Sequence, residues 1–206
     1  MRFLIFFCII GHIHASYEIV MPTKNRQIKN YLLESLESFK DKHIFLYRHG
    51  ENFDDFEEAC MYLNILCKTL DVDLDIKDDY LKWRTEQNIL VKTILKDFLS
   101  RGKDYVVWVE DDVLLIDSLD FINRLNENII CLREGYRYCG LTGYIFSRLF
   151  VSDLIENIEI EKDNMPIDWI VDKTVHIKNY FKKRKSVIKH IGLYSSRKDN
   201  IKREID

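Results

Sequence analysis

The 206-residue chain contains few of the residues that interrupt regular structure, with only seven glycines and two prolines. It has no internal repeat, no low-complexity tract and no Asn-x-Ser/Thr sequence, so N-glycosylation of the chain itself is not expected. Glycine-rich loops of the kinds that cradle phosphate are also absent, which argues against kinase and dehydrogenase chemistry. The 31 basic and 34 acidic residues nearly cancel, and a net charge of −3 indicates no nucleic-acid partner. With 47% hydrophobic residues, one domain with a sizeable core is expected.

The N-terminal apolar run, residues 3–10, is too short to span a bilayer, which takes about 20 residues. It follows one basic residue and precedes Ala15 and Ser16, a pattern typical of a short signal peptide. A buried first strand is the alternative. We expect residues 1–16 to be a leader cleaved near Ala15, and residues 17–206 to form a single domain. This predicts a protein of the secretory pathway lumen, in the Golgi or endoplasmic reticulum, or a secreted one.

The five cysteines show no spacing typical of a metal site. Cys60 and Cys67 lie within residues 53–70, where the apolar spacing predicts a helix. Such a helix would separate them by about 10 Å along its axis, too far for a disulfide. Cys131 and Cys139 are able to close a loop as a disulfide in an oxidising lumen, and two free buried thiols are the equal alternative.

Short apolar strands alternate with helical patterns along the chain. The expected strands are residues 18–21, 43–47 and 105–109, and the expected helices are residues 27–39, 53–70 and 82–100. This alternation indicates βαβ units, and therefore an α/β fold with a mostly parallel sheet flanked by helices.

Three adjacent acids, Glu110, Asp111 and Asp112, directly follow the strand at residues 105–109. Ligands of α/β folds collect outside the carboxyl ends of the strands. Three neighbouring carboxylates repel one another, and a divalent cation removes that cost. Hard oxygen ligands suit Mg²⁺ or Mn²⁺ holding a diphosphate. The alternative is that two of the acids cap the next helix and the third is solvated.

Several further segments occur in a characteristic order around this triplet. They are MPTKNRQIKNYLLESL at 21–36, KWRTEQN at 82–88, VEDDV at 109–113, MPIDWIVD at 165–172 and HIGLYSS at 190–196. Together they resemble the catalytic domain of the alpha-1,3-mannosyl-glycoprotein beta-1,4-N-acetylglucosaminyltransferases of type IV, glycosyltransferase family 54. The resemblance implies a GT-A fold, a divalent metal (Mn²⁺ or Mg²⁺) and UDP-GlcNAc as the UDP-sugar donor. It also implies inverting transfer of N-acetylglucosamine to a mannose of an N-glycan in beta-1,4 linkage.

The resemblance also assigns roles around the triplet. Asp112 is the expected metal ligand, together with His190 of the HIG stretch, for which a core histidine bonded to backbone is the alternative. Glu110 and Asp111 are expected to hold the donor's ribose and sugar hydroxyls or a metal-bound water.

Pro22, Thr23 and Arg26 lie on the first βα turn, where the GT-A fold implied by the resemblance binds uridine. The planar guanidinium group of Arg84, in KWRTEQN, is suited to bind the diphosphate. Helix capping by Thr85 and packing of the neighbouring tryptophan explain the motif equally well.

Inverting transfer needs a base that deprotonates the acceptor hydroxyl. Asp168 is the expected base, near a sugar-stacking Trp169 in the first turn of a helix that starts at Pro166. A first-turn acid without a catalytic role is the alternative reading of Asp168, and Asp172 is the other candidate base. Residues 140–144 resemble the segment that lines the sugar pocket.

The segments between the motifs are shorter than in the family, notably between Tyr47 and Lys82. This leaves the acceptor and the exact sugar open. Transferases that add N-acetylgalactosamine to the glycan of GPI anchors share an acidic triplet and a similar histidine-containing tail, so they are one alternative. A sugar-binding protein that keeps the scaffold without catalysis is the other.

Overall fold

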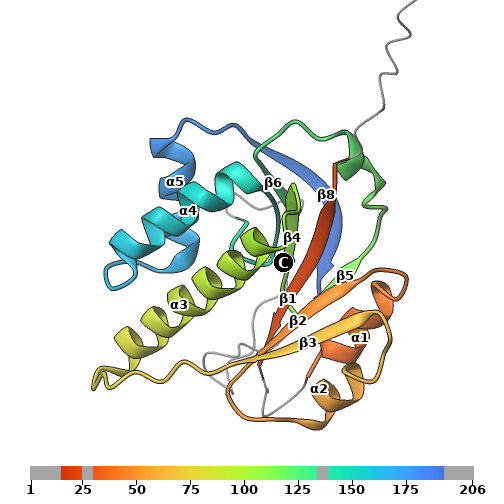
Figure 1. The fold of residues 1–206 in the computed structure, drawn as a ribbon, viewed down its shortest axis with the longest axis horizontal. Helices are drawn as coiled ribbons and strands as arrows, with labels where there is room; N and C mark the ends of the chain where they lie inside the picture. The colour runs from red at the N-terminus through yellow and green to blue at the C-terminus, as the bar shows by residue number, and fades with distance from the viewer. Residues whose placement is uncertain (1–14, 25–29, 134–138, 193–206) are drawn as a thin grey trace, which may run out of the picture.

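The computed structural model describes residues 15–24, 30–133 and 139–192. These residues form one curled eight-stranded sheet with helices on both faces (Figure 1). The strands are β1 (Tyr17–Thr23), β2 (Ile44–His49), β3 (Ile65–Leu70), β4 (Tyr105–Val109), β5 (Val113–Leu115), β6 (Ile129–Arg133), β7 (Gly143–Ser147) and β8 (Lys182–His190). The helices are α1 (Leu32–Ser38), α2 (Asp54–Ala59), α3 (Asp79–Ser100), α4 (Arg148–Glu161) and α5 (Ile167–Ile177), with a 3-10 turn at Asp120–Arg124.

The strand order is β3-β2-β1-β4-β7-β6-β8-β5. Pairing is parallel from β3 through β2 and β1 to β4, and again between β6 and β8. It is antiparallel for β4 with β7, β6 with β7 and β5 with β8. The expected α/β fold with a mostly parallel sheet flanked by helices is thus confirmed as a mixed sheet. The strand expected at residues 105–109 is confirmed as β4.

Two apolar cores lie on opposite faces of the sheet. The first packs α1 and α2 against the sheet through side chains such as Leu36 and Phe56. The second packs the longer helices α3, α4 and α5 through side chains such as Ile94, Leu154 and Ile170. All five residues of β4 are buried, because both faces of this central strand are covered by helices.

The helix expected at residues 53–70 is wrong. Helix α2 ends at Ala59, and Ile65–Leu70 form β3, which pairs in parallel with β2. The side-chain amide of Asn64 fixes the turn by donating to two backbone carbonyls before β2, at 2.9 and 2.6 Å. The apolar spacing of a short segment does not distinguish a helix from a strand. Here residues 65–70 form a strand because they pair with the edge of β2 that faces away from β1.

The same turn overturns the expectation that Cys60 and Cys67 are too far apart to bond. Their Cα atoms lie 5.7 Å apart and the two residues form a disulfide. Cys131 and Cys139, with Cα atoms 6.0 Å apart, form a second one, which is the first of the two alternatives considered for that pair.

Residues 1–14 of the expected leader lie outside the described residues. Ser16, at the expected end of the leader, belongs to the folded domain, because its N–H and hydroxyl donate to Asp104 Oδ2 at 2.8 and 2.9 Å. In the part of the chain that the structure describes, no helix is long and apolar enough to cross a membrane.

Candidate metal centre and adjoining clefts

The acidic triplet lies where β4 ends, at the carboxyl edge of the parallel half of the sheet. The backbone N–H of Glu110 donates to Thr142 O at 3.1 Å, which ties the triplet to the segment before β7. After Asp112 the chain enters the short strand β5. The triplet therefore lies in a connection between two strands, and the alternative in which two of its acids cap a following helix is wrong.

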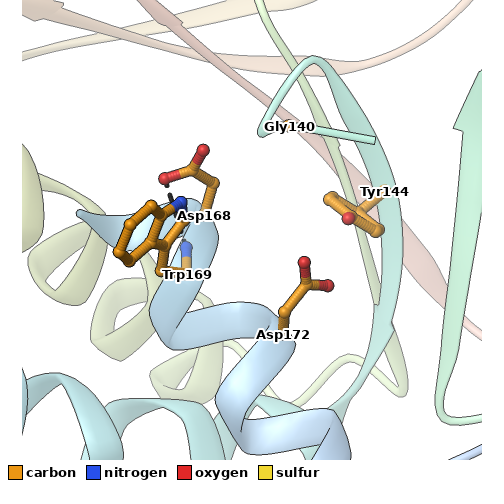
Figure 2. A pocket seen from close by; sticks show the side chains of 5 residues that line it. All are labelled: Gly140, Tyr144, Asp168, Trp169 and Asp172. Atoms are coloured by element: carbon orange, nitrogen blue, oxygen red, sulfur yellow. Dashed lines mark hydrogen bonds between the residues drawn. The ribbon is translucent and has the colours of Figure 1, made fainter. Parts of the chain in front are cut away.

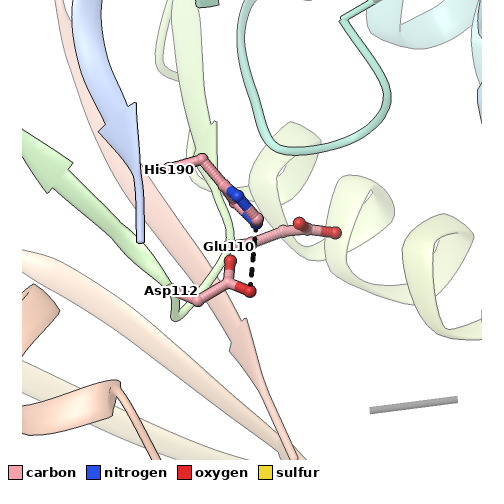
Figure 3. Close-up of side chains that lie close together, drawn as sticks. All are labelled: Glu110, Asp112 and His190. Atoms are coloured by element: carbon pink, nitrogen blue, oxygen red, sulfur yellow. Dashed lines mark ion pairs between the residues drawn. The ribbon is translucent and has the colours of Figure 1, made fainter. Parts of the chain in front are cut away.

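Glu110, Asp112 and His190 bring three potential metal ligands together (Figure 3). One ligand atom from each residue lies within 4.8 Å of the other two. His190 reaches this position because it ends β8 and pairs with Val113 of β5, directly after Asp112. The backbone N–H of Ile191 then donates to Asp112 O at 2.8 Å. The pairing of β5 with β8 thus assembles the cluster.

The chemistry and size of this cluster fit a divalent cation. Two carboxylates and one imidazole form a ligand set that suits Mn²⁺. Opposite ligands of an octahedral ion of this class are about 4.2 Å apart, so the observed spacing needs only small side-chain rotations. His190 Nε2 lies 3.2 Å from the buried Asp112 Oδ2, so the two residues also form an ion pair when the imidazole is protonated. Glu110, expected to hold the hydroxyls of the donor or a metal-bound water, lies among the potential metal ligands.

Gly192 is a residue of this site that sequence reasoning missed. A Cβ at this position would lie 2.0 Å from Asp112 Oδ2 and 2.7 Å from Asp112 Cγ. Only glycine allows the backbone after β8 to pass this close to the carboxylate. The sequence did contain a signal for this role, because Gly192 lies two residues after the predicted ligand His190 in the HIG stretch.

Asp111 occupies a different position from its two neighbours. It is buried and accepts a hydrogen bond from Thr23 Oγ1 at 2.6 Å. Thr23 ends β1, which is the parallel neighbour of β4. The structure therefore brings together two residues predicted to bind the donor, but they contact each other. Pro22 lies beside Tyr47 of β2, and Arg26 falls outside the described residues.

Three residues of KWRTEQN hold the segment 162–165, which leads into α5. Arg84 donates to Asp163 O, and Thr85 donates to the Asp163 carboxylate at 3.3 Å. The fully buried Asn88 donates to two backbone carbonyls of that segment, at 2.7 and 3.0 Å. The motif thereby fixes where α5 begins, a role for Asn88 that sequence reasoning missed.

The N-terminus of α3 lies upstream of this motif. Asp78 caps it by accepting from the backbone N–H of Leu81 at 2.7 Å, so the alternative in which Thr85 is the cap is wrong. Trp83 lies in the first turns of α3 and lines a cleft.

Two clefts extend from the triplet toward α5. The smaller has a volume of about 190 Å³ and is lined by Trp83, Arg84, Gln87, Glu110, Leu141, Pro166, Ile167 and Asp168. The larger has a volume of about 530 Å³ and is lined by Gly140, Tyr144, Asp168, Trp169 and Asp172 (Figure 2). Glu110 connects the metal cluster to the smaller cleft, because it belongs to the one and lines the other. Asp168 lines both clefts and so connects the smaller to the larger. The order of the site is therefore metal cluster, small cleft, Asp168 and large cleft.

No protein-family model matches the chain, and no curated protein matches it at a significant level. Evidence for function therefore lies in the arrangement of these residues.

The two candidate bases on α5 have different surroundings. Asp172 Oδ1 accepts from Lys182 Nζ at 2.7 Å. Asp168 lies in the first turn and accepts only from the backbone N–H of Trp169, at 3.1 Å, and no ion pair joins it to another residue of the described ranges. The Asp168 carboxylate is therefore the one able to take up a proton without breaking an ion pair.

Tyr144 closes the larger cleft opposite α5 (Figure 2). Burial, together with the nearby Asp172 carboxylate, raises the pKa of this phenol well above its usual value. Tyr144 thus remains neutral, and its ring forms an apolar wall.

Proposed function

We propose that this protein is a metal-dependent inverting glycosyltransferase with a GT-A fold. Its donor would be UDP-GlcNAc, and the N-acetylglucosamine would be transferred to a mannose of an N-glycan in beta-1,4 linkage. The observation that carries this proposal is the order of the site, in which Glu110 of the candidate metal cluster and Asp168 both line the small cleft. The sequence motifs that suggested the transferase family contribute residues to each part of this order.

Inverting transfer requires the leaving group and the base on opposite sides of the reacting sugar carbon. Glu110, Asp112 and His190 would hold Mn²⁺ or Mg²⁺, which neutralises charge on a bound diphosphate. Asp168, which also lines the small cleft, would accept the proton of the acceptor hydroxyl. Asp168 is preferred to Asp172 because Lys182 already pairs with Asp172.

Arg84 would contribute its positive charge to the diphosphate side of the small cleft, which it lines. Thr23 and Asp111 would keep the edges of β1 and β4 in place through their hydrogen bond. Pro22 would remain at the nucleotide side, as expected for the first βα turn. In this arrangement the protein orients donor and acceptor, and the carboxylate of Asp168 moves the proton.

The two disulfides favour an oxidising compartment, since such bonds are rare in reducing ones. They support the proposed location in the lumen of the secretory pathway, in the Golgi or the endoplasmic reticulum, or outside the cell. That is also where N-glycan acceptors are found.

The test is release of UDP by the purified protein in the presence of Mn²⁺, a panel of UDP-sugars and N-glycan acceptors. We expect turnover with UDP-GlcNAc, its loss in Asp112→Ala, and a fall of about 10²–10⁴-fold in Asp168→Asn. Asp172→Asn should retain more turnover than Asp168→Asn, and the exposed Glu156→Gln should match the unsubstituted protein.

The outcomes distinguish the alternatives. Turnover with UDP-N-acetylgalactosamine and a GPI glycan alone would replace the proposed donor and acceptor. Metal-dependent UDP binding without turnover on any acceptor would identify a sugar-binding protein. Full activity in folded Asp112→Ala would overturn the proposed metal centre.

A further inference from the structure

We propose that the larger cleft is a binding site for an uncharged saccharide, with the indole of Trp169 as its stacking surface. The identification of this saccharide as the acceptor rests on the proposed function. The binding site itself rests on the lining of the cleft and can be tested without catalysis.

The first observation is the exposure of Trp169. Its side chain is 65% exposed, whereas the next two residues of α5, Ile170 and Val171, are fully buried in the core. The indole therefore contributes little to the packing of α5. It borders a cleft of about 530 Å³, a volume within the usual range for small-molecule sites. Unlike the other exposed apolar side chains, such as Phe181, this aromatic ring forms part of the wall of a cleft, where it offers a flat surface to a ligand with an apolar face.

The second observation is the charge around the cleft. Asp168 and Asp172 project from the same helix toward it (Figure 2). Lys182 Nζ lies 2.7 Å from Asp172 Oδ1 and 5.3 Å from the centre of the Tyr144 ring, so it neutralises one of the two carboxylates. Arg184 also acts electrostatically on Tyr144, so the two carboxylates near the cleft are balanced by two cations and an uncharged ligand is favoured over a strongly anionic or cationic one. Carboxylates accept hydrogen bonds from hydroxyl groups, which a sugar supplies in number.

These two observations together describe the ligand. A sugar ring has a face of C–H groups that packs on an indole and hydroxyl groups around its rim that donate to carboxylates. Because Asp168 lines both clefts, a saccharide in the larger cleft has one end beside this carboxylate. An organic cation is the competing ligand, since carboxylates and aromatic rings also attract ammonium groups.

The experiment is isothermal titration of the purified full-length protein with neutral oligosaccharides that end in mannose or galactose, with and without UDP and Mn²⁺. The matched anionic probe is an oligosaccharide that ends in sialic acid, and the cationic probe is tetramethylammonium. We expect saturable binding of a neutral oligosaccharide, weakened about tenfold or more by Trp169→Ala and less by Trp169→Phe. Phe181→Ala is the control, because Phe181 is 76% exposed and lines neither cleft.

Three results would overturn the inference. They are the absence of neutral-saccharide binding under both conditions, saccharide binding that Trp169→Ala leaves unchanged, and tighter binding of tetramethylammonium or the anionic probe. Metal-dependent UDP binding, measured on the same samples, separates the two proposals. If UDP binds and saccharides do not, only the saccharide site is wrong, whereas loss of both contradicts the proposed function as well.

Discussion

Gly192→Ala is the substitution that most directly tests the metal centre. The added Cβ would lie 2.0 Å from Asp112 Oδ2, and a real Cβ contact is essentially never below 3.0 Å, so the two atoms must separate by about 1 Å. Metal–ligand distances tolerate only about 0.2 Å. Asp112 is fully buried and has little room to move without leaving its position. We therefore expect the affinity for Mn²⁺ to fall by about 10–100-fold or more, with a stability cost of about 1–3 kcal/mol from overpacking.

The assay is Mn²⁺ binding by electron paramagnetic resonance, combined with urea unfolding of the same samples. Gly102→Ala provides the matched control, because Gly102 has φ +73° and a Cβ there meets no atom within 4 Å. Gly102 lies between α3 and the start of β4, whereas Glu110 follows the end of β4, so Gly102 is at the far end of this strand from the site. The control is expected to lose about 1 kcal/mol of stability through backbone strain while binding Mn²⁺ normally.

The decisive comparison is between affinity and stability. Folded Gly192→Ala that binds Mn²⁺ as tightly as the unsubstituted protein would refute the assignment of Asp112 as a ligand. Equal losses of Mn²⁺ affinity in both glycine variants would show that general destabilisation, and not the contact with Asp112, controls binding.

Three further predictions concern the rest of the molecule. Asn88→Ala removes two buried hydrogen bonds to the segment before α5, so we expect the free energy of unfolding to fall by about 2–3 kcal/mol. An unchanged urea midpoint would contradict the role of KWRTEQN in holding that segment. Although burial raises the pKa of Asp97, hydrogen bonds from three neighbouring side chains outweigh it and lower that pKa below 3.8. The stability that Asp97 contributes is therefore present above about pH 4 and lost as the pH falls through the folded-state pKa, so the deficit of Asp97→Asn, about 1–2 kcal/mol at pH 7, should shrink in acid unfolding curves. The carboxylate of Asp104 accepts hydrogen bonds from Ser16, so cleavage after Ala15 would place the new amino group of Ser16 beside a negative charge. If the leader is removed there, intact mass measurement of the exported protein should show a chain that begins at Ser16.

Local sequence patterns predicted the central strand of the fold. They failed where the secondary structure of a segment depends on its pairing with a distant one. The apolar run at residues 105–109 and the acids after it fixed β4 and the triplet, because a doubly buried strand and its carboxyl end are both local features. Residues 65–70 were assigned to a helix because their spacing does not reveal the neighbouring edge of β2.

The site shows the same division. His190 was predicted from its motif, but its contact with Asp112 depends on the pairing of β5 with β8, which no local pattern contains. The roles of Asn88 and Gly192 depend on backbone atoms of segments far away in the sequence. Such roles become visible only when the segments are placed side by side.

The pairing of β5 with β8 also sets when the candidate metal centre can form during synthesis. Asp112 leaves the ribosome well before His190, which ends β8, and Gly192, which follows that strand. The two apolar cores can begin to pack while the Asp112 carboxylate still lacks His190. A nascent chain without β8 would therefore lack both the proposed ion ligand His190 and the core side chains Val187 and Ile188, so the candidate site and the first core are completed in the same step.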